Sequence, residues 1–218
     1  MAKLRLVIAN KNYSSWSLRP WLAMAMAGID FDESMVLLDT PGTKKQIGEQ
    51  SPAGRLPVLH HGKITIWETL AILEYLAETF PAKNLWPKPK SARALARAIS
   101  SEMHAGFSGL RNACPMNLRR PSKAVKLDEA TLRDITRIEE IWRDCRKTYG
   151  KGGKFLFGKF CNADAMFAPV VTRFETYSIP VAKDTRTYMD AVMATKAFQS
   201  WKAAAFAETW IVPHDEVD

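Results

Sequence analysis

The pattern of apolar residues changes near residue 81, and this change predicts a chain of two dissimilar domains. Before it, short apolar runs alternate with helical periodicity, which is typical of an α/β domain. After it, only helical patterns recur. The stretch between them, PAKNLWPKPKSA, has three prolines and no periodicity, as linkers do. We expect an α/β domain over residues 1–80, a linker over 81–92 and an all-α domain over 93–218.

The pattern of the N-terminal segment predicts a mixed four-stranded sheet covered by helices. Strands are predicted at residues 4–9, 34–38, 56–60 and 63–67, and helices at 18–28, 41–50 and 69–80. A strand–helix–strand unit implies a parallel pair, and the turn at His61-Gly62 implies an antiparallel hairpin. Ser17 is a candidate cap for the first helix, and Gly28 is expected at its end.

The C-terminal segment is predicted to contain helices at residues 91–110, 128–149, 163–176 and 184–205. The polar sequence PHDEVD at the end of the chain is expected to fray. Three cysteines without a C-x-x-C pair, and only 4 histidines, argue against a metal site. They suit buried thiols in a reducing compartment.

The net charge of +8 comes mainly from the residues after position 83. Such a field can attract nucleic acid, a small anion or only solvent. No nucleic-acid-binding motif accompanies it, so we expect no nucleic-acid partner. No apolar run approaches a membrane span, and no signal peptide is recognisable. The sequence therefore predicts a soluble, cytoplasmic protein.

The turn NYSSWSLRPWL (12–22) is the first candidate site. Pro20 belongs in the first turn of a helix, where amide groups lack intrahelical partners, so the helix should begin near residues 16–18. Ser14 and Ser15 would then lie at a helix N-terminus, which favours anions. The alternative is that these serines serve only as caps and turn residues.

Pro57 interrupts a predicted strand in SPAGRLPVL (51–59). A cis bond between Leu56 and Pro57 would explain it, and the Leu56 backbone could then pair with a peptide-like ligand. A trans proline at a strand start is the alternative.

Glu68 and Thr69 open the next predicted helix. The pair could be a simple helix start, since an acidic group and a hydroxyl are both favourable there. The pair could also bind an α-amino acid, with Thr69 binding the carboxylate and Glu68 the ammonium group.

Together these features resemble the glutathione S-transferase family, over essentially the whole chain. Ser14 to Arg19 is similar to the serine-type active-site turn, in particular that of zeta-class enzymes. Gly54-Arg55-Leu56-Pro57 resembles the segment before the family's cis-proline, and Glu68-Thr69 its acid–serine pair. Phe157 to Asp164 resembles the capping-box segment of the helical domain.

The sequence departs from the family pattern at three positions. Trp16 replaces the zeta-class cysteine, and Thr69 replaces serine while keeping the hydroxyl. Cys161 stands where the capping box has serine or threonine. Because a thiol is a poor acceptor, Asp164 is expected to cap that helix alone.

The resemblance implies a thioredoxin-like N-terminal domain and glutathione as co-substrate. Its backbone would lie along Leu56 and Pro57, its γ-glutamyl end at Glu68 and Thr69, and its glycine carboxylate near Arg55. Ser14, or alternatively Ser15, would stabilise the thiolate without acting as a nucleophile. We expect no Ser-His-Asp triad.

The family resemblance places the electrophile between the domains, and implies a homodimer. The candidate residues are Met103, His104, Phe107 and Arg111, although core packing is the alternative for each. Arg111 or Arg173 could hold an acidic substrate.

These sequence features, together with the family resemblance, are compatible with three functions. The chain is expected to be a glutathione transferase acting on a small electrophile. The alternatives are a glutathione-dependent cis-trans isomerase of the zeta type and a non-catalytic binding module.

Overall fold

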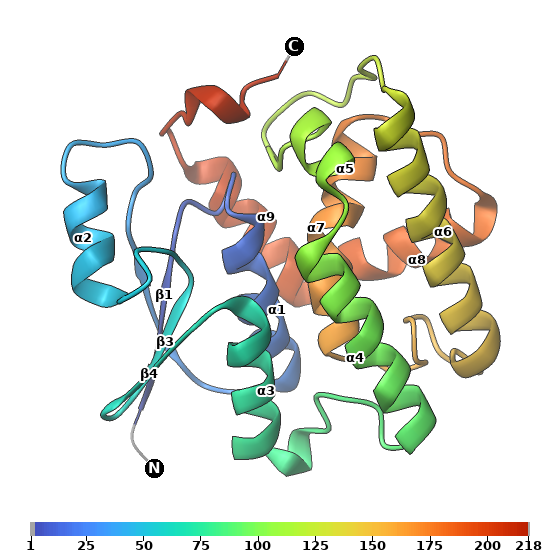
Figure 1. Cartoon of the computed structure of the whole chain (residues 1–218), viewed down its shortest axis with the longest axis horizontal. Coiled ribbons are helices and arrows are strands. Elements are labelled where there is room, and N and C mark those ends of the chain that lie inside the picture. Colours follow the sequence, from blue (N-terminus) through green and yellow to red (C-terminus); the bar gives the residue numbers. More distant parts are fainter. Residues whose placement is uncertain (1–2, 218) are drawn as a thin grey trace.

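The N-terminal domain is built on a four-stranded sheet in the computed structural model, which describes residues 3–217 (Figure 1). The order across the sheet is β2 (Asp32–Met35), β1 (Leu4–Ile8), β3 (Val58–His61) and β4 (Ile64–Trp67). β1 and β2 are parallel and the other neighbours antiparallel, which confirms the predicted mixed, thioredoxin-like sheet.

Helices cover both faces of this sheet. α1 (Ser15–Ala27) and α3 (Thr69–Thr79) lie on the face toward the second domain, and α2 (Thr43–Gln50) lies on the other side (Figure 1). Alternation along β1 explains the two layers. Leu6 and Ile8 enter the large core, whereas Val7 joins Val36 and Val58 in a small cluster toward α2.

Three local predictions in this domain were wrong. The second strand ends at Met35 rather than Leu38, because the Leu38 amide donates to the Asn10 side chain (2.7 Å) instead of continuing the ladder. The hairpin turn is Gly62-Lys63, one residue later than predicted, with Gly62 at φ 61°. The first helix begins at Ser15, with Ser14 rather than Ser17 as its cap.

The second domain is all-helical, as predicted. Its elements are α4 (Lys90–Ala105), α5 (Ser108–Ala113), α6 (Glu129–Tyr149), α7 (Asn162–Thr176), α8 (Lys183–Met193) and α9 (Lys196–Ala207), with short 3-10 turns at Pro81–Lys83 and Pro213–Asp215. All but one residue of α7 are buried, so α7 forms the centre of this domain. No helix among residues 3–217 is long and apolar enough to cross a membrane.

Two of the predicted long helices are each a pair of helices. The first breaks at Gly106-Phe107, where Phe107 has φ 61° and a Cβ on Gly106 would approach the Glu102 carbonyl oxygen to 2.9 Å. The second breaks at Thr195, whose hydroxyl caps α9 by accepting from the Phe198 amide (3.2 Å). Both breaks depend on local backbone geometry that apolar periodicity does not encode.

The segment after α9 is held in place, contrary to the expected fraying. The Glu208 carboxylate accepts hydrogen bonds from the amides of Lys11 (2.6 Å) and Asn12 (3.1 Å). Tyr13 donates its hydroxyl to the Glu216 carboxylate. Residues 208–217, the C-terminal strap from here on, therefore pack against the turn that precedes α1.

Candidate functional site

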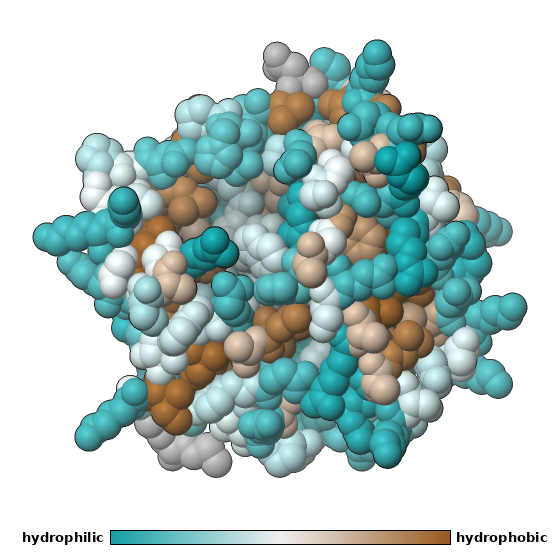
Figure 2. Space-filling view, viewed as in Figure 1, coloured by the Kyte–Doolittle hydropathy of each residue, from teal (hydrophilic) through white to brown (hydrophobic). Residues whose placement is uncertain are grey.

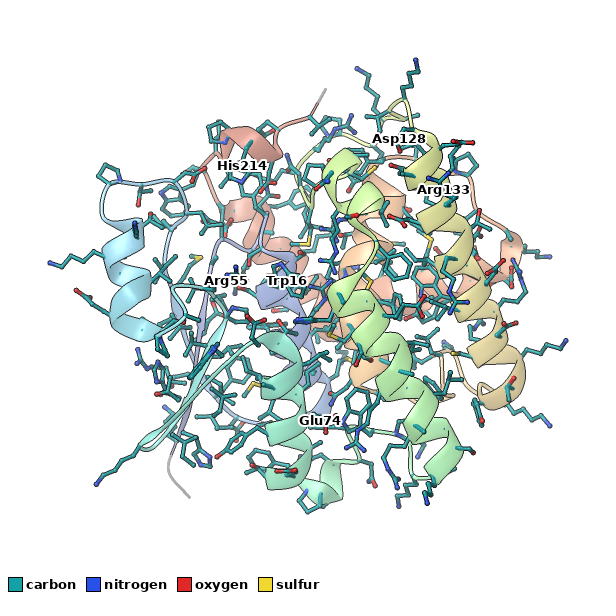
Figure 3. All side chains as sticks on the ribbon, in the orientation of Figure 1. Trp16, Arg55, Glu74, Asp128, Arg133 and His214 are labelled. Atoms are coloured by element: carbon teal, nitrogen blue, oxygen red, sulfur yellow. The ribbon has the colours of Figure 1, made fainter. Side chains whose placement is uncertain are left out.

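Two neighbouring cavities share the side chain of Trp16. The smaller, about 220 Å³, is lined by Trp16, Arg55, Leu56, Pro57, Glu68, Thr69 and His104. The larger, about 450 Å³, has Ser14, Ser15, Arg111 and Arg173 among its lining residues. Figure 2 shows the surface hollowed between the N-terminal domain and α4–α5, and Figure 3 places Trp16 beside Arg55 in that region. The residues predicted to bind glutathione and the two predicted serines thus line adjoining cavities.

Ser14 is held at the start of α1 by a network of serines. Its Oγ accepts from the Ser17 amide (3.3 Å) and donates to the Ser17 hydroxyl (2.8 Å), which itself accepts from the Ala9 amide (3.0 Å). Ser14 is half-buried and lines the larger cavity. Its hydroxyl therefore sits where the N-terminal end of α1 favours negative charge.

Ser15 occupies the first helical position and lines the same cavity. It is only 6% exposed, so its hydroxyl is less accessible than that of half-buried Ser14. Both serines predicted from the turn thus reach the cavity, and both remain candidates for stabilising a thiolate.

The segment facing the turn carries the predicted cis bond between Leu56 and Pro57. Leu56 and Pro57 line the smaller cavity, and exposed Arg55 lines both cavities. The Arg55 amide is held by the Ser51 hydroxyl (3.4 Å), which fixes the approach to the proline.

Thr69 behaves differently from the expectation for its hydroxyl. Pro20 has no amide hydrogen for the carbonyl of Trp16, four residues earlier in α1. The Thr69 hydroxyl donates to that carbonyl instead (3.2 Å). The Thr69 side chain is therefore structural, which leaves its backbone amide at the α3 N-terminus for a ligand carboxylate.

Glu68 precedes α3 with φ 67° and is exposed to the smaller cavity. Its carboxylate lies 3.8 Å from Nε2 of His104. A negative group beside a helix N-terminus matches the predicted recognition of an α-amino acid, with opposite charges at its two ends.

Trp16, the departure from the zeta-class pattern, lies close to two guanidinium groups. Arg19 is centred 4.2 Å from its ring and Arg111 4.7 Å, distances at which a cation attracts an aromatic face. Arg19 is fully buried, and burial lowers its pKa, with Arg111 and Arg173 adding to the effect. The indole ring therefore contacts two cations that also repel one another.

The two arginines proposed to hold an acidic substrate differ in their contacts and burial. Arg111 donates to the carbonyls of Met103, His104 and Gly106 at the end of α4. Arg173 donates Nε to the Cys114 carbonyl (2.8 Å), while its buried Nη1 has no hydrogen-bond partner. Burial lowers the pKa of Arg173 to about 10, so it stays charged near neutral pH. Both arginines line the larger cavity, and Arg173 is the more deeply buried of the two.

The remaining residues predicted to bind the substrate do not lie together in the structure. Met103 and Phe107 are buried in the core and line neither cavity, because the break after α4 turns Phe107 inward. His104 lines the smaller cavity, beside Glu68, rather than the larger one. Sequence reasoning missed Tyr13 as a lining residue, and also His214 and Asp215, which the C-terminal strap brings to the larger cavity.

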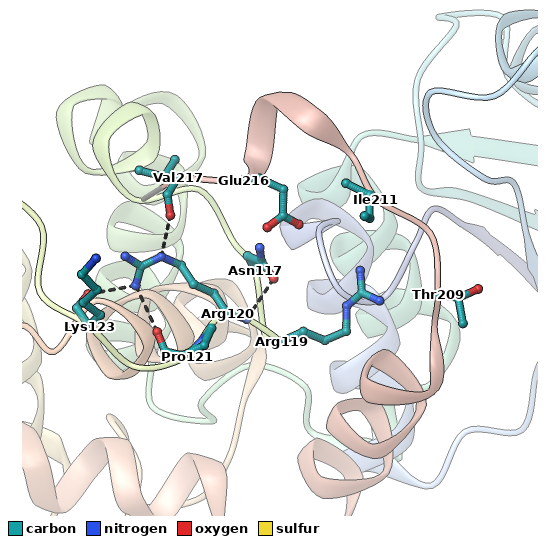
Figure 4. Close-up of a pocket in the computed structure, with 9 residues that line it drawn as sticks. All are labelled: Asn117, Arg119, Arg120, Pro121, Lys123, Thr209, Ile211, Glu216 and Val217. Carbon is teal, nitrogen blue, oxygen red and sulfur yellow. Dashed lines mark hydrogen bonds between the residues drawn. The ribbon is translucent and has the colours of Figure 1, made fainter.

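A third cavity, about 630 Å³, lies under the C-terminal strap (Figure 4). Its arginines are already engaged: Arg120 donates to the carbonyls of Val217 and Lys123 (2.8 Å each), and Arg119 to those of Glu208 and Trp210. The arginine side chains at this cavity therefore hold the C-terminal strap in place.

The fold and the two cavities define a two-domain protein of the thioredoxin-like class, with a serine turn facing a cis-proline. Residues 13–79 match the family model "Glutathione S-transferase, N-terminal domain". The chain is 36% identical to maleylacetoacetate isomerase from Mus musculus over 174 residues, covering 78% of each chain. It is 29% identical to the Rattus norvegicus protein of the same name over 194 residues, covering 85% of this chain and 87% of the relative.

The fold agrees with solved structures. A Burkholderia glutathione transferase homologue with bound glutathione superposes with a TM-score of 0.71 at 22% identity, over 93% of this chain and 98% of that one. The chain belongs to the glutathione S-transferase family, and the relatives named here include maleylacetoacetate isomerases of similar length.

Proposed function

We propose that this protein is a glutathione-dependent isomerase acting on a small unsaturated dicarboxylate. The observation that carries the proposal is Arg173, a buried cation that lines the cavity also containing Ser14. The names of the mouse and rat relatives support the same reaction. The sequence alone favoured conjugation of glutathione to an electrophile, with isomerisation as an alternative. We now place isomerisation first.

Ser14 stabilises the glutathione thiolate, with Ser15 as the alternative. A free thiol of this type has a pKa near 8.5 and is only a few per cent ionised at pH 7. A hydrogen bond from Ser14 and the N-terminal end of α1 both favour the anion. The Ser14 hydroxyl would exchange its present acceptor, Ser17, for the sulfur.

Glutathione occupies the smaller cavity, with Glu68 on its ammonium and the Thr69 amide on its carboxylate. The thiolate adds to one carbon of the substrate's double bond, which becomes a single bond and rotates. Expulsion of the thiolate then restores the double bond in the trans form, so glutathione is not consumed. Arg173 holds a substrate carboxylate during this sequence.

The test is product analysis with a cis-enedione diacid and glutathione. A trans product with glutathione recovered in full supports the isomerase. A stable adduct with glutathione consumed supports conjugation, the second candidate function. Absence of any thiolate absorbance on adding glutathione, from neutral to alkaline pH, would favour a non-catalytic binding module.

We also propose a homodimer, on the strength of the family and of the exposed Ile64 and Trp67 on edge strand β4. Light scattering of the purified protein measures its mass directly. A cytoplasmic location stays a prediction.

A further inference from the structure

His104 is the one histidine at the smaller cavity among the residues described. It stands in the last turn of α4, about one-third exposed, with its ring edge-on to Trp16 at 5.2 Å between ring centres. Its Nε2 lies 3.8 Å from the Glu68 carboxylate, and its Nδ1 is buried without a partner. The proposed mechanism gives the His104 side chain no role, either at the glutathione thiol or elsewhere.

From this geometry we propose that His104 is a positioning residue that controls glutathione binding through Glu68. The inference rests on the proposed function, because it assumes that Glu68 holds the ammonium of glutathione. Neutral His104 leaves the Glu68 carboxylate free for that ammonium. Protonated His104 pairs with Glu68 and repels the incoming cation, so the protein binds glutathione more weakly in acid.

Burial and two neighbouring arginines favour the neutral ring of His104 in the unliganded protein, against the charge of Glu68. Arg19 approaches from α1 and Arg111 from α5, and Arg55 is a further lining residue of the cavity. Burial is the main cause of the lowered pKa of His104, and the two arginines add to it, whereas Glu68 opposes it. Binding an ammonium to Glu68 removes that opposing contribution, so ligand and proton compete.

The probe is S-methylglutathione, because it has no thiol to ionise. Its dissociation constant is measured by calorimetry from about pH 8 to about pH 5, the range in which a histidine titrates. For the native protein we expect binding to weaken with falling pH, by up to about tenfold per pH unit below the pKa of His104. An analogue with hydrogen in place of the γ-glutamyl amino group should show no such weakening.

His104→Gln keeps a hydrogen-bonding group but cannot titrate, so its affinity should be independent of pH. The matched control is His60→Gln. His60 is also half-buried with a pKa lowered by burial, but it bonds Thr65 in the β3–β4 hairpin and should keep the native pH dependence. An unchanged pH dependence in His104→Gln would overturn the inference and leave the proposed function standing. No saturable binding of the probe at any pH would overturn both.

A second measurement avoids any substitution that perturbs folding. The pKa of His104 is followed by nuclear magnetic resonance in the native protein, with and without saturating S-methylglutathione. Competition for Glu68 requires that the ligand lower this pKa. An equal or higher value in the complex would contradict the inference.

Discussion

The hydroxyl of Thr69 bonds the main-chain carbonyl of Trp16 at 3.2 Å, which joins α3 to the interior of α1. Pro20 creates the need for this bond, since a residue with an amide hydrogen at position 20 would serve the same carbonyl within the helix. The threonine therefore compensates for a proline in another element.

Thr69→Val should lower the free energy of unfolding by about 1–3 kcal/mol, because it leaves the Trp16 carbonyl without a partner while keeping the side-chain shape. Chemical denaturation measures the change. The same substitution in a Pro20→Ala background should cost less, since the new amide can reach the carbonyl. Equal costs in both backgrounds would contradict this explanation.

Glu208→Gln should destabilise the protein by roughly 2 kcal/mol, because a charged acceptor of two amide hydrogen bonds is replaced by a neutral group with one oxygen. The turn that carries Ser14 should also lose order, so turnover should fall more than glutathione affinity. Denaturation and steady-state kinetics test the two effects. Glu49→Gln, on the exposed side of α2, is the control and should change neither.

Asp164 should make stability fall as pH rises from about 4 to about 6. Burial raises the pKa of this carboxyl to about 6 in the folded protein, so the folded state binds the extra proton in that interval. Protons bound preferentially by the folded state stabilise it at low pH, and this contribution, about 3 kcal/mol, disappears as the carboxyl ionises.

The measurement is the unfolding free energy of the native protein minus that of Asp164→Asn at several pH values. Asp164→Asn is expected to be less stable throughout, because the carboxylate accepts from the amides of Leu156 (3.0 Å) and Cys161 (2.9 Å). The stability advantage of the native protein over Asp164→Asn should nevertheless shrink as pH rises from 4 to 6, because the folded native protein loses its extra proton in that range. A difference that grows with pH would refute the prediction.

Arg173→Met should reduce kcat/KM for the diacid by roughly 30-fold or more, the effect of removing one partner of a buried charge pair. For a neutral diester of the same substrate the loss should be small. Arg186→Met removes a cation that pairs with Glu175 at the surface and is the control. If Arg173→Met affected diacid and diester equally, its role would be structural.

The sequence predicted an α/β sheet domain followed by helices, because apolar periodicity and proline placement are local signals. The Leu56-Pro57 cis bond, the Gly28 helix end and the Asp128 start of α6 all follow from single residues. Ser14 and Ser15 were expected at the start of α1 for the same reason, because Pro20 limits where that helix can begin.

Contacts between distant segments could not be predicted in this way. Phe107 looked like part of an amphipathic stripe, but a positive φ at that residue ends the stripe. His104 was assigned to the substrate because helix spacing cannot say that Glu68 lies opposite it. Residues 213–218 were expected to fray, since their polar sequence gives no sign that Tyr13 binds Glu216 or that Arg120 binds the Val217 carbonyl.

The strap has a consequence for the order of events during synthesis. Domains tend to fold from the N-terminus as the chain emerges from the ribosome. The amides of Lys11 and Asn12 are made nearly two hundred residues before Glu208, the group that receives their hydrogen bonds. A nascent N-terminal domain can thus acquire its sheet early, yet the turn that carries Ser14 must wait for the strap before its hydrogen bonds are complete.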